Sequence, residues 1–187
     1  MLKLSWTNFS TRFVYLVQEG VDCAIRAGTL PDSTLVSRPL GYCSLTTVAA
    51  PDYLIAHGEP AVPEELKEHA CIANLSPSTG RTREWVFEKD HTRQAMQLSG
   101  SLTIGTVEAS VQAARMGLGI TQVVSLASRD LIARGELKEI LADWSAVGPA
   151  MQLVYEKSRM PSARLRAFIE FTVELFAQQL SDPPGQN

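Results

Sequence analysis

The stretch SGSLTIGTVEASVQAARMGLGITQVV, residues 99–124, determines the predicted fold. Its first part is extended in pattern, and we expect a strand over residues 97–104. Gly105 or Thr106 then caps a helix, since small and hydroxyl side chains favour that position. The helix is expected to run to about Met116, with an acidic residue in its first turn that suits the helix dipole. A strand that leads directly into a helix is typical of α/β proteins.

Glycine ends this helix, and a similar unit is predicted near the N-terminus. Gly117 is expected at the helix stop, because glycine adopts the left-handed conformation found there. A second strand then covers residues 119–124. In the N-terminal unit, strands at 2–9 and 21–25 flank a helix at 11–18. Two strands joined through a helix imply a parallel sheet covered by helices.

Apolar periodicity and the positions of proline and glycine predict the remaining elements. These are an extended run at 40–50, short helices at 51–57 and 60–70, a strand at 71–75, a hairpin around Trp85 and Phe87, a short helix at 128–134, a strand at 150–157 and an amphipathic helix at 162–179. The two extended runs at 40–50 and 150–157 could both connect two α/β lobes.

Composition places the chain among ordinary globular proteins. It has 187 residues, a hydrophobic fraction of 45%, a charged fraction of 20% and a formal net charge of −3. This slightly negative charge argues against direct binding to the phosphate backbone of nucleic acids. No apolar run approaches the ~20 residues that a membrane helix needs, and the N-terminus lacks the apolar core of a signal peptide. We therefore expect a soluble, cytoplasmic protein that contacts no membrane.

The sequence contains no recognisable catalytic or metal-binding pattern. It has neither a GxSxG elbow nor a phosphate-binding glycine loop, so we expect no enzymatic activity and no cofactor. His57, His69 and His91 lack metal-ligand spacing, and no metal site is predicted. Cys43 could respond to oxidants if its thiolate were stabilised, although a buried, inert thiol is the commoner case.

Five passages occur in the order found in one protein family. They are RFVYLVQEGVDCAIRAGTLPDSTLVSRPLG (residues 12–41), AAPDYLIAHGEPAVPEEL (49–66), WVF (85–87), GTVEASVQAARMGLGI (105–120) and LIARGELKEIL (131–141). Together they resemble the effector-binding domain of LysR-type bacterial transcriptional regulators, and the resemblance covers nearly the whole chain. The combination is specific, whereas each passage alone would be weak.

This resemblance implies an α/β fold of two Rossmann-like lobes, of the type 2 periplasmic-binding-protein kind, joined by two crossover strands. Lobe one would comprise residues 1–45 and 150–187, and lobe two residues 46–149. The family's winged helix-turn-helix is missing from the sequence, as are the first strand and helix of lobe one. Lobe one is therefore expected to be N-terminally truncated. Tyr15 and Val124 stand where the family frequently has aspartate and proline.

The resemblance also implies a function. A small organic effector, aromatic or carboxylate in character, would bind between the lobes, and the domain would form a homodimer or tetramer. DNA would be bound only through the missing N-terminal domain. Two alternatives stay open: a solute-binding protein of the same fold, and a truncated fragment that acts only by dimerisation through helices 11–18 and 106–116. An enzyme on this scaffold is disfavoured, because no nucleophile, base or metal constellation is present.

The candidate effector-binding residues lie at expected strand ends, at a helix N-terminus and in the connecting strand. They are Arg26, Ala27, Gly28, Thr46, Thr47, Thr106, Gln122 and Val123. Arg26 would pair with a carboxylate, unless it is a turn residue in a surface salt bridge. Thr106 could bind an anion, act as a plain N-cap, or do both. The hydroxyls of Thr46 and Thr47 would face the effector, unless these threonines only favour the strand.

Overall fold

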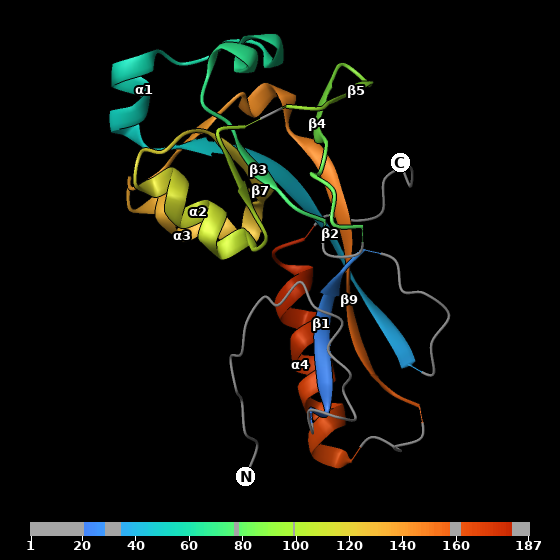
Figure 1. Cartoon of the computed structure of the whole chain (residues 1–187). Helices are drawn as coiled ribbons and strands as arrows, with labels where there is room; N and C mark the ends of the chain where they lie inside the picture. Colours follow the sequence, from blue (N-terminus) through green and yellow to red (C-terminus); the bar gives the residue numbers. More distant parts are fainter. Residues whose placement is uncertain (1–20, 29–34, 77–78, 99, 158–161, 181–187) are drawn as a thin grey trace. The chain divides into compact units, whose positions relative to one another are not determined.

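The structure divides the chain into two compact units (Figure 1). The computed structural model describes residues 21–28, 35–76, 79–98, 100–157 and 162–180. One unit, called the larger unit below, contains Leu45–Ala146. The other, the smaller unit, contains the described residues within Val14–Ser44 and Val147–Asn187. The strand and the helix predicted at 2–9 and 11–18 lie outside the described residues.

Parallel strands form the centre of the larger unit. β3 (Ile72–Asn74) pairs in parallel with β6 (Leu102–Ile104). A parallel bridge joins Cys71 to Ile120, immediately before β7 (Thr121–Val124). β6 corresponds to the strand predicted at 97–104. It is shorter than predicted, because the pairing with β3 covers three residues. The C-terminal ends of β3, β6 and β7 consequently lie at the same edge, where open parallel sheets bind ligands.

Two helices cover these strands. The predicted helix is confirmed as α2 (Val107–Arg115), and the Thr106 hydroxyl caps it by accepting a hydrogen bond from the Ala109 N–H. Gly117 follows the helix with a φ of 76°, which explains the glycine at that stop. α3 (Ser125–Ala133) begins three residues earlier than predicted. α2 and α3 pack against each other, and both contact β7 (Figure 1).

Antiparallel strands extend the sheet. β2 (Leu35–Ala49) pairs with β7, and β8 (Lys138–Ile140) also pairs with β2. The order of hydrogen-bonded strands is β1-β9-β2-β7, with β8 also on β2. β2 and β9 (Ala146–Glu156) each contribute residues to both units. Both strands are longer than the extended runs predicted at 40–50 and 150–157, because each begins several residues earlier than predicted.

An apolar cluster joins the remaining elements of the larger unit. The predicted helix at 51–57 is confirmed as α1 (Pro51–His57), while the next short helix is a 3₁₀ helix, η1 (Pro63–Glu68). The predicted hairpin is confirmed as β4 (Trp85–Lys89) and β5 (Thr92–Met96). Buried side chains from these elements form one cluster, which includes Tyr53, Leu54, Leu66, Trp85 and Phe87.

In the smaller unit, β1 (Cys23–Ala27) pairs antiparallel with β9. This antiparallel pairing was not predicted from the sequence, and the parallel pairing that was predicted for β1 involves residues 2–9, which lie outside the described residues. β1 also runs two residues further than predicted, so Arg26 lies within the strand, opposite Gln152, and not beyond its end. α4 (Ala163–Ala177) follows, capped by Ser162. None of the described helices has the length and apolarity needed to cross a lipid bilayer.

Candidate functional site

A buried polar network lies where β3 ends and α2 begins. Asn74, the last residue of β3, accepts a hydrogen bond from the Ser110 hydroxyl, with the two oxygens 2.5 Å apart. The Asn74 amide nitrogen donates to the Thr121 hydroxyl at 3.2 Å and to the Gln122 carbonyl at 3.1 Å. Thr121 in turn donates to the Ile72 carbonyl. This network fixes the first turns of α2 against β3 and β7.

The network was not predicted from the sequence. Ser110 and Thr121 are fully buried and Asn74 is nearly so, and each has a partner for its polar atoms. Burying such groups is tolerated only when they are paired. The signal that could have revealed them is the presence of asparagine and threonine in strands that are otherwise apolar, and of serine on the inner face of α2.

Gln122 joins β7 to the hairpin. Its side-chain oxygen accepts from the Val86 N–H at 2.9 Å, and its nitrogen donates to the Val86 carbonyl, also at 2.9 Å. The same nitrogen lies 3.4 Å from the Thr47 hydroxyl, on the paired strand β2. The side chain of Gln122 therefore makes structural contacts, and its predicted contact with an effector stays a prediction.

The other predicted residues of the larger unit differ in exposure. Thr46 and Thr47 are both buried, and they pair with Val123 and Gln122 across the β2–β7 ladder. The Val123 side chain belongs to an apolar cluster under α2 and α3, so only its backbone is available for polar contacts. Thr106 is exposed at the N-terminus of α2, where its hydroxyl serves as the cap. The structure thus brings Thr47 and Gln122 into direct contact.

Arg26, Ala27 and Gly28 belong to the smaller unit. Gly28 has a φ of 92°, which a residue with a side chain would adopt only with strain. Its N–H donates to the Ala150 carbonyl at 2.8 Å, and its carbonyl accepts from the Gln152 side chain at 2.8 Å. These contacts fasten the end of β1 to β9. Arg26 is half-buried and Ala27 is exposed.

A pocket of about 470 Å³ opens in the larger unit between the hairpin and β6. Its lining residues are neutral, namely Thr82, Gln97, Leu98, Gly100 and Thr103. The Gln97 amide donates to the Thr82 hydroxyl at 2.7 Å. Gly100 leaves no space for a side chain, because an added Cβ would lie 1.9 Å from the Cys71 carbonyl oxygen. None of these residues was predicted, because single polar residues in a polar segment carry no distinguishing pattern.

Residues 4–177 match the LysR substrate binding domain family. The chain belongs to this family. One relative is the uncharacterized HTH-type transcriptional regulator YhjC of Escherichia coli K12, which is 32% identical over 171 residues. That match covers 90% of this chain and 56% of YhjC. The chain spans about half the length of the curated relatives it matches.

The LysR domain is similar in structure to solved regulators of the same family. The regulatory domain of CrgA, a LysR-type transcriptional regulator from Neisseria meningitidis, superposes with a TM-score of 0.77 at 30% identity, over 89% of this chain and 81% of that one. Full-length AphB, the Vibrio cholerae virulence activator, gives a TM-score of 0.70 at 25% identity, over 89% of this chain and 56% of AphB. The fold class is therefore the α/β, periplasmic-binding-protein-like fold of LysR regulatory domains.

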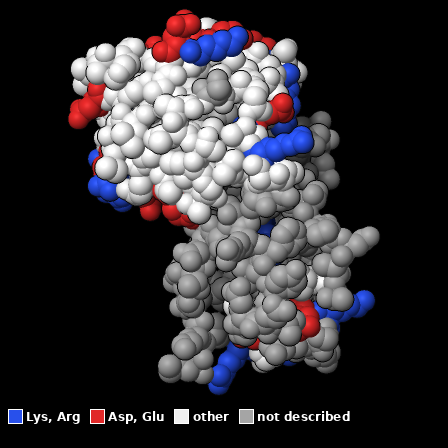
Figure 2. Space-filling model, in the orientation of Figure 1, with Lys and Arg blue, Asp and Glu red and all other residues white. Residues whose placement is uncertain are grey.

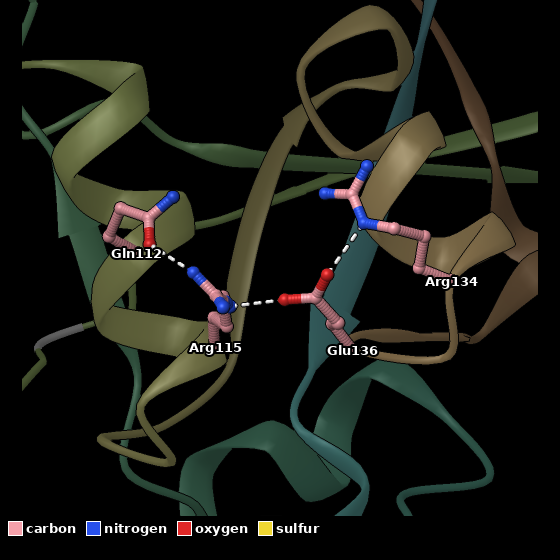
Figure 3. A network of polar contacts seen from close by, with 4 residues as sticks. All are labelled: Gln112, Arg115, Arg134 and Glu136. Carbon is pink, nitrogen blue, oxygen red and sulfur yellow. Dashed lines mark hydrogen bonds and ion pairs between the residues drawn. The ribbon is translucent and has the colours of Figure 1, made fainter.

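A network of ion pairs joins the C-terminal end of α2 to the segment after α3 in the LysR domain (Figure 3). Nε of Arg115 lies 2.5 Å from Glu136, and Nε of Arg134 donates to the same carboxylate at 2.6 Å. Gln112 accepts a hydrogen bond from Arg115 at 3.2 Å. The hydrogen bond from Arg134, together with the charge of Arg115, lowers the pKa of Glu136, and the same bond raises the pKa of Arg134. Surface ion pairs contribute little stability, so this network mainly orients the helix end.

The thiols of the LysR domain are poorly suited to ionisation. Burial raises the pKa of the Cys71 thiol to about 11, and its S–H donates to the Leu66 carbonyl. Burial, and to a smaller extent the charge of Asp22, also raises the pKa of Cys23. Cys43 is buried. Across the described ranges, no three His, Cys, Asp or Glu side chains converge to hold a metal ion.

Proposed function

We propose that this chain is the small-molecule effector-sensing and oligomerisation domain of a LysR-type transcription regulator, and that it has no catalytic activity. The observation that carries the proposal is the match of residues 4–177 to the LysR substrate binding domain family. The effector would shift the population of two arrangements of the domain, because it binds one of them more tightly. The division into lobes at 1–45 with 150–187, and at 46–149, is part of this proposal.

The geometry of the larger unit supports a small organic effector. The α2 N-terminus provides the positive end of the helix dipole, which favours a carboxylate. The pocket described above offers neutral hydrogen-bonding groups from Thr82, Gln97 and Thr103. We propose an effector with a carboxylate and an uncharged aliphatic or aromatic body. Arg26, Ala27 and Gly28 of the smaller unit remain proposed effector-binding residues.

Oligomerisation is proposed through the face that carries α2. In the orientation of Figure 1, the visible face of the larger unit has few charged side chains (Figure 2). Met116, at the end of α2, is 75% exposed, and Leu118 is 48% exposed. Exposed apolar surface of this kind marks sites of protein association. We propose a homodimer or tetramer in the cytoplasm, with DNA contacted by a helix-turn-helix outside the region that this chain shares with its relatives.

The effector proposal is tested by thermal unfolding with a panel of aliphatic and aromatic carboxylates and their neutral amides. Saturation by an acid at 100 times its dissociation constant should stabilise the protein by about 2.7 kcal/mol. Thr106→Ala should reduce the stabilisation that the acid causes. Ser162→Ala, which removes the cap of α4, should lower the melting temperature of the protein without ligand and leave the stabilisation by the acid unchanged. If no acid shifts the transition of the folded protein, effector sensing by this chain is wrong.

The oligomerisation proposal is tested by light scattering after size exclusion. The unaltered chain should elute as a dimer or tetramer, and the double variant Met116→Glu, Leu118→Glu should elute as a monomer, since both side chains are exposed and their replacement leaves the core unchanged. A strict monomer at high protein concentration would exclude association through this face.

A further inference from the structure

Both apolar and polar contacts attach the β4–β5 hairpin to the larger unit. In the part of the chain that the structure describes, β4 and β5 form a two-stranded sheet of their own. Trp85 and Phe87 anchor the hairpin in the apolar cluster. Lys89 lies over the Trp144 ring and 3.7 Å from the exposed carboxylate of Asp143.

The Gln122 side chain acts as a substitute for a third strand beside the hairpin. Its amide oxygen and nitrogen bond to the N–H and the carbonyl of Val86, which is the pattern a neighbouring strand would provide. Losing the side chain would leave both backbone groups of Val86 without these partners. The hairpin already contains one unsatisfied group, since the buried amide nitrogen of Gln94 has no hydrogen-bond partner among the described residues. Its docking is therefore sensitive to the loss of further hydrogen bonds.

The same amide also contacts the Thr47 hydroxyl. The nitrogen of Gln122 has two hydrogens, one directed to the Val86 carbonyl at 2.9 Å and one to Thr47 at 3.4 Å. Thr46, the preceding residue, points to the opposite side of β2, because side chains alternate along a strand. A change at the Thr47 hydroxyl therefore reaches the hairpin through one side chain, and a change at Thr46 does not.

We infer that Gln122 is a positioning residue that ties the Thr47 hydroxyl to the β4–β5 hairpin, so that the hairpin responds when that hydroxyl changes partners. The meaning of this link for regulation rests on the proposed effector-sensing function and on the sequence prediction that Thr47 contacts the effector. An effector group that bonds to Thr47 would compete with Gln122 and loosen or shift the hairpin. Gln122 itself would act through its neighbours and would not contact the effector.

The first experiment measures amide hydrogen exchange of the full chain without any ligand. In Gln122→Met, which keeps the length of the side chain and removes its hydrogen bonds, exchange across residues 85–96 should accelerate at least about fivefold, the factor expected for one net hydrogen bond of about 1 kcal/mol. The amide of Ile72, which bonds to the Ile120 carbonyl in the parallel sheet, should keep its rate. Gln112→Met on the exposed face of α2 is the matched control. Equal acceleration throughout the larger unit, or none in the hairpin, would overturn the inference.

The second experiment tests the link to Thr47. Thr47→Val should accelerate hairpin exchange, whereas Thr46→Val, an equally buried threonine on the same strand, should not. Adding Thr47→Val to Gln122→Met should cause no further change, because the link is already broken. Indistinguishable effects of the two threonine variants would refute the link. Since no ligand is used, failure of the carboxylate panel would count against the proposed function and leave this result intact.

Discussion

The hydrogen bond between Asn74 and Ser110 provides the most direct test of the buried network. Both side chains are nearly or fully buried, and their oxygens lie 2.5 Å apart. We consider Asn74→Ala, Ser110→Ala and the double variant. If the network fixes α2 to β3 and β7 as described, the two single substitutions must be strongly coupled, because each removes the partner of the other.

The expected losses of unfolding free energy follow from the buried groups that each substitution leaves without a hydrogen-bond partner. Ser110→Ala leaves the Asn74 oxygen buried without a donor, which should cost about 1–3 kcal/mol of unfolding free energy. Asn74→Ala leaves the Gln122 carbonyl without this donor and opens a small void, which should cost about 2–4 kcal/mol of unfolding free energy. The Ser110 hydroxyl can then turn to the Thr106 carbonyl, 3.1 Å away. The double variant leaves no Asn74 oxygen to satisfy, so it should cost about 1–2 kcal/mol less than the sum of the single costs.

Urea unfolding followed by tryptophan fluorescence measures these values, since Trp85 and Trp144 both report on the larger unit. Ser101→Ala, at an exposed serine near the start of β6, serves as the control and should change the free energy of unfolding by less than about 0.5 kcal/mol. Costs that add within about 0.3 kcal/mol would refute the reasoning, because independent side chains behave in that way.

Three further predictions concern single residues. Cys71, whose pKa is raised to about 11 by burial, should resist iodoacetamide at pH 8 while the half-buried Cys23 reacts first; mass spectrometry showing equal labelling would contradict this. The pKa of Glu136 is lower in the folded protein than its value of about 4.3 in the unfolded chain. Its ion pairs therefore stabilise the fold at pH values above about 4.3, and this stabilisation is lost as the pH falls through the pKa of the folded state. The stability difference between the unaltered chain and Glu136→Gln, measured by urea titration, should accordingly vanish in acid; a difference that persists there would speak against the network. Gly119→Ala should lower stability by at least about 2 kcal/mol in thermal unfolding, because its Cβ would lie 2.2 Å from the Ala70 carbonyl oxygen; an unchanged melting temperature would exclude this contact.

Local sequence signals predicted the helices of the larger unit well. The helix at 51–57 was found through its leading proline, and α2 through a capping hydroxyl at Thr106 and a glycine stop at Gly117. Strand partners were less accessible to sequence reasoning. The described partner of β1 is the antiparallel strand β9, more than a hundred residues away, and the sequence did not predict this pairing. The apolar pattern of a strand reports that it is buried and does not report which strand lies beside it.

In the candidate site, too, local signals predicted positions along the chain but not the long-range partners of the side chains. Thr106 was predicted at the α2 N-terminus, and it lies there as the cap. The side chain of Gln122 bonds to Val86 and Thr47, which are 36 and 75 residues distant in sequence, and these bonds were not predicted; its contact with an effector stays a prediction. The roles of Asn74, Ser110 and Thr121 were missed, because each depends on a partner from another strand or helix.

The sequence by itself determined where α2 begins and ends, which faces are apolar, and that the chain resembles LysR effector-binding domains. These properties depend on residues within about one helical turn of each other, or on the order of passages along the chain. Only the tertiary structure decided how the polar residues are used. Asn74 and Gln122 became structural links because strand order and register place them against buried groups that must be paired. A buried hydrogen bond is satisfied by whatever partner the fold brings near, and that partner is set by long-range pairing.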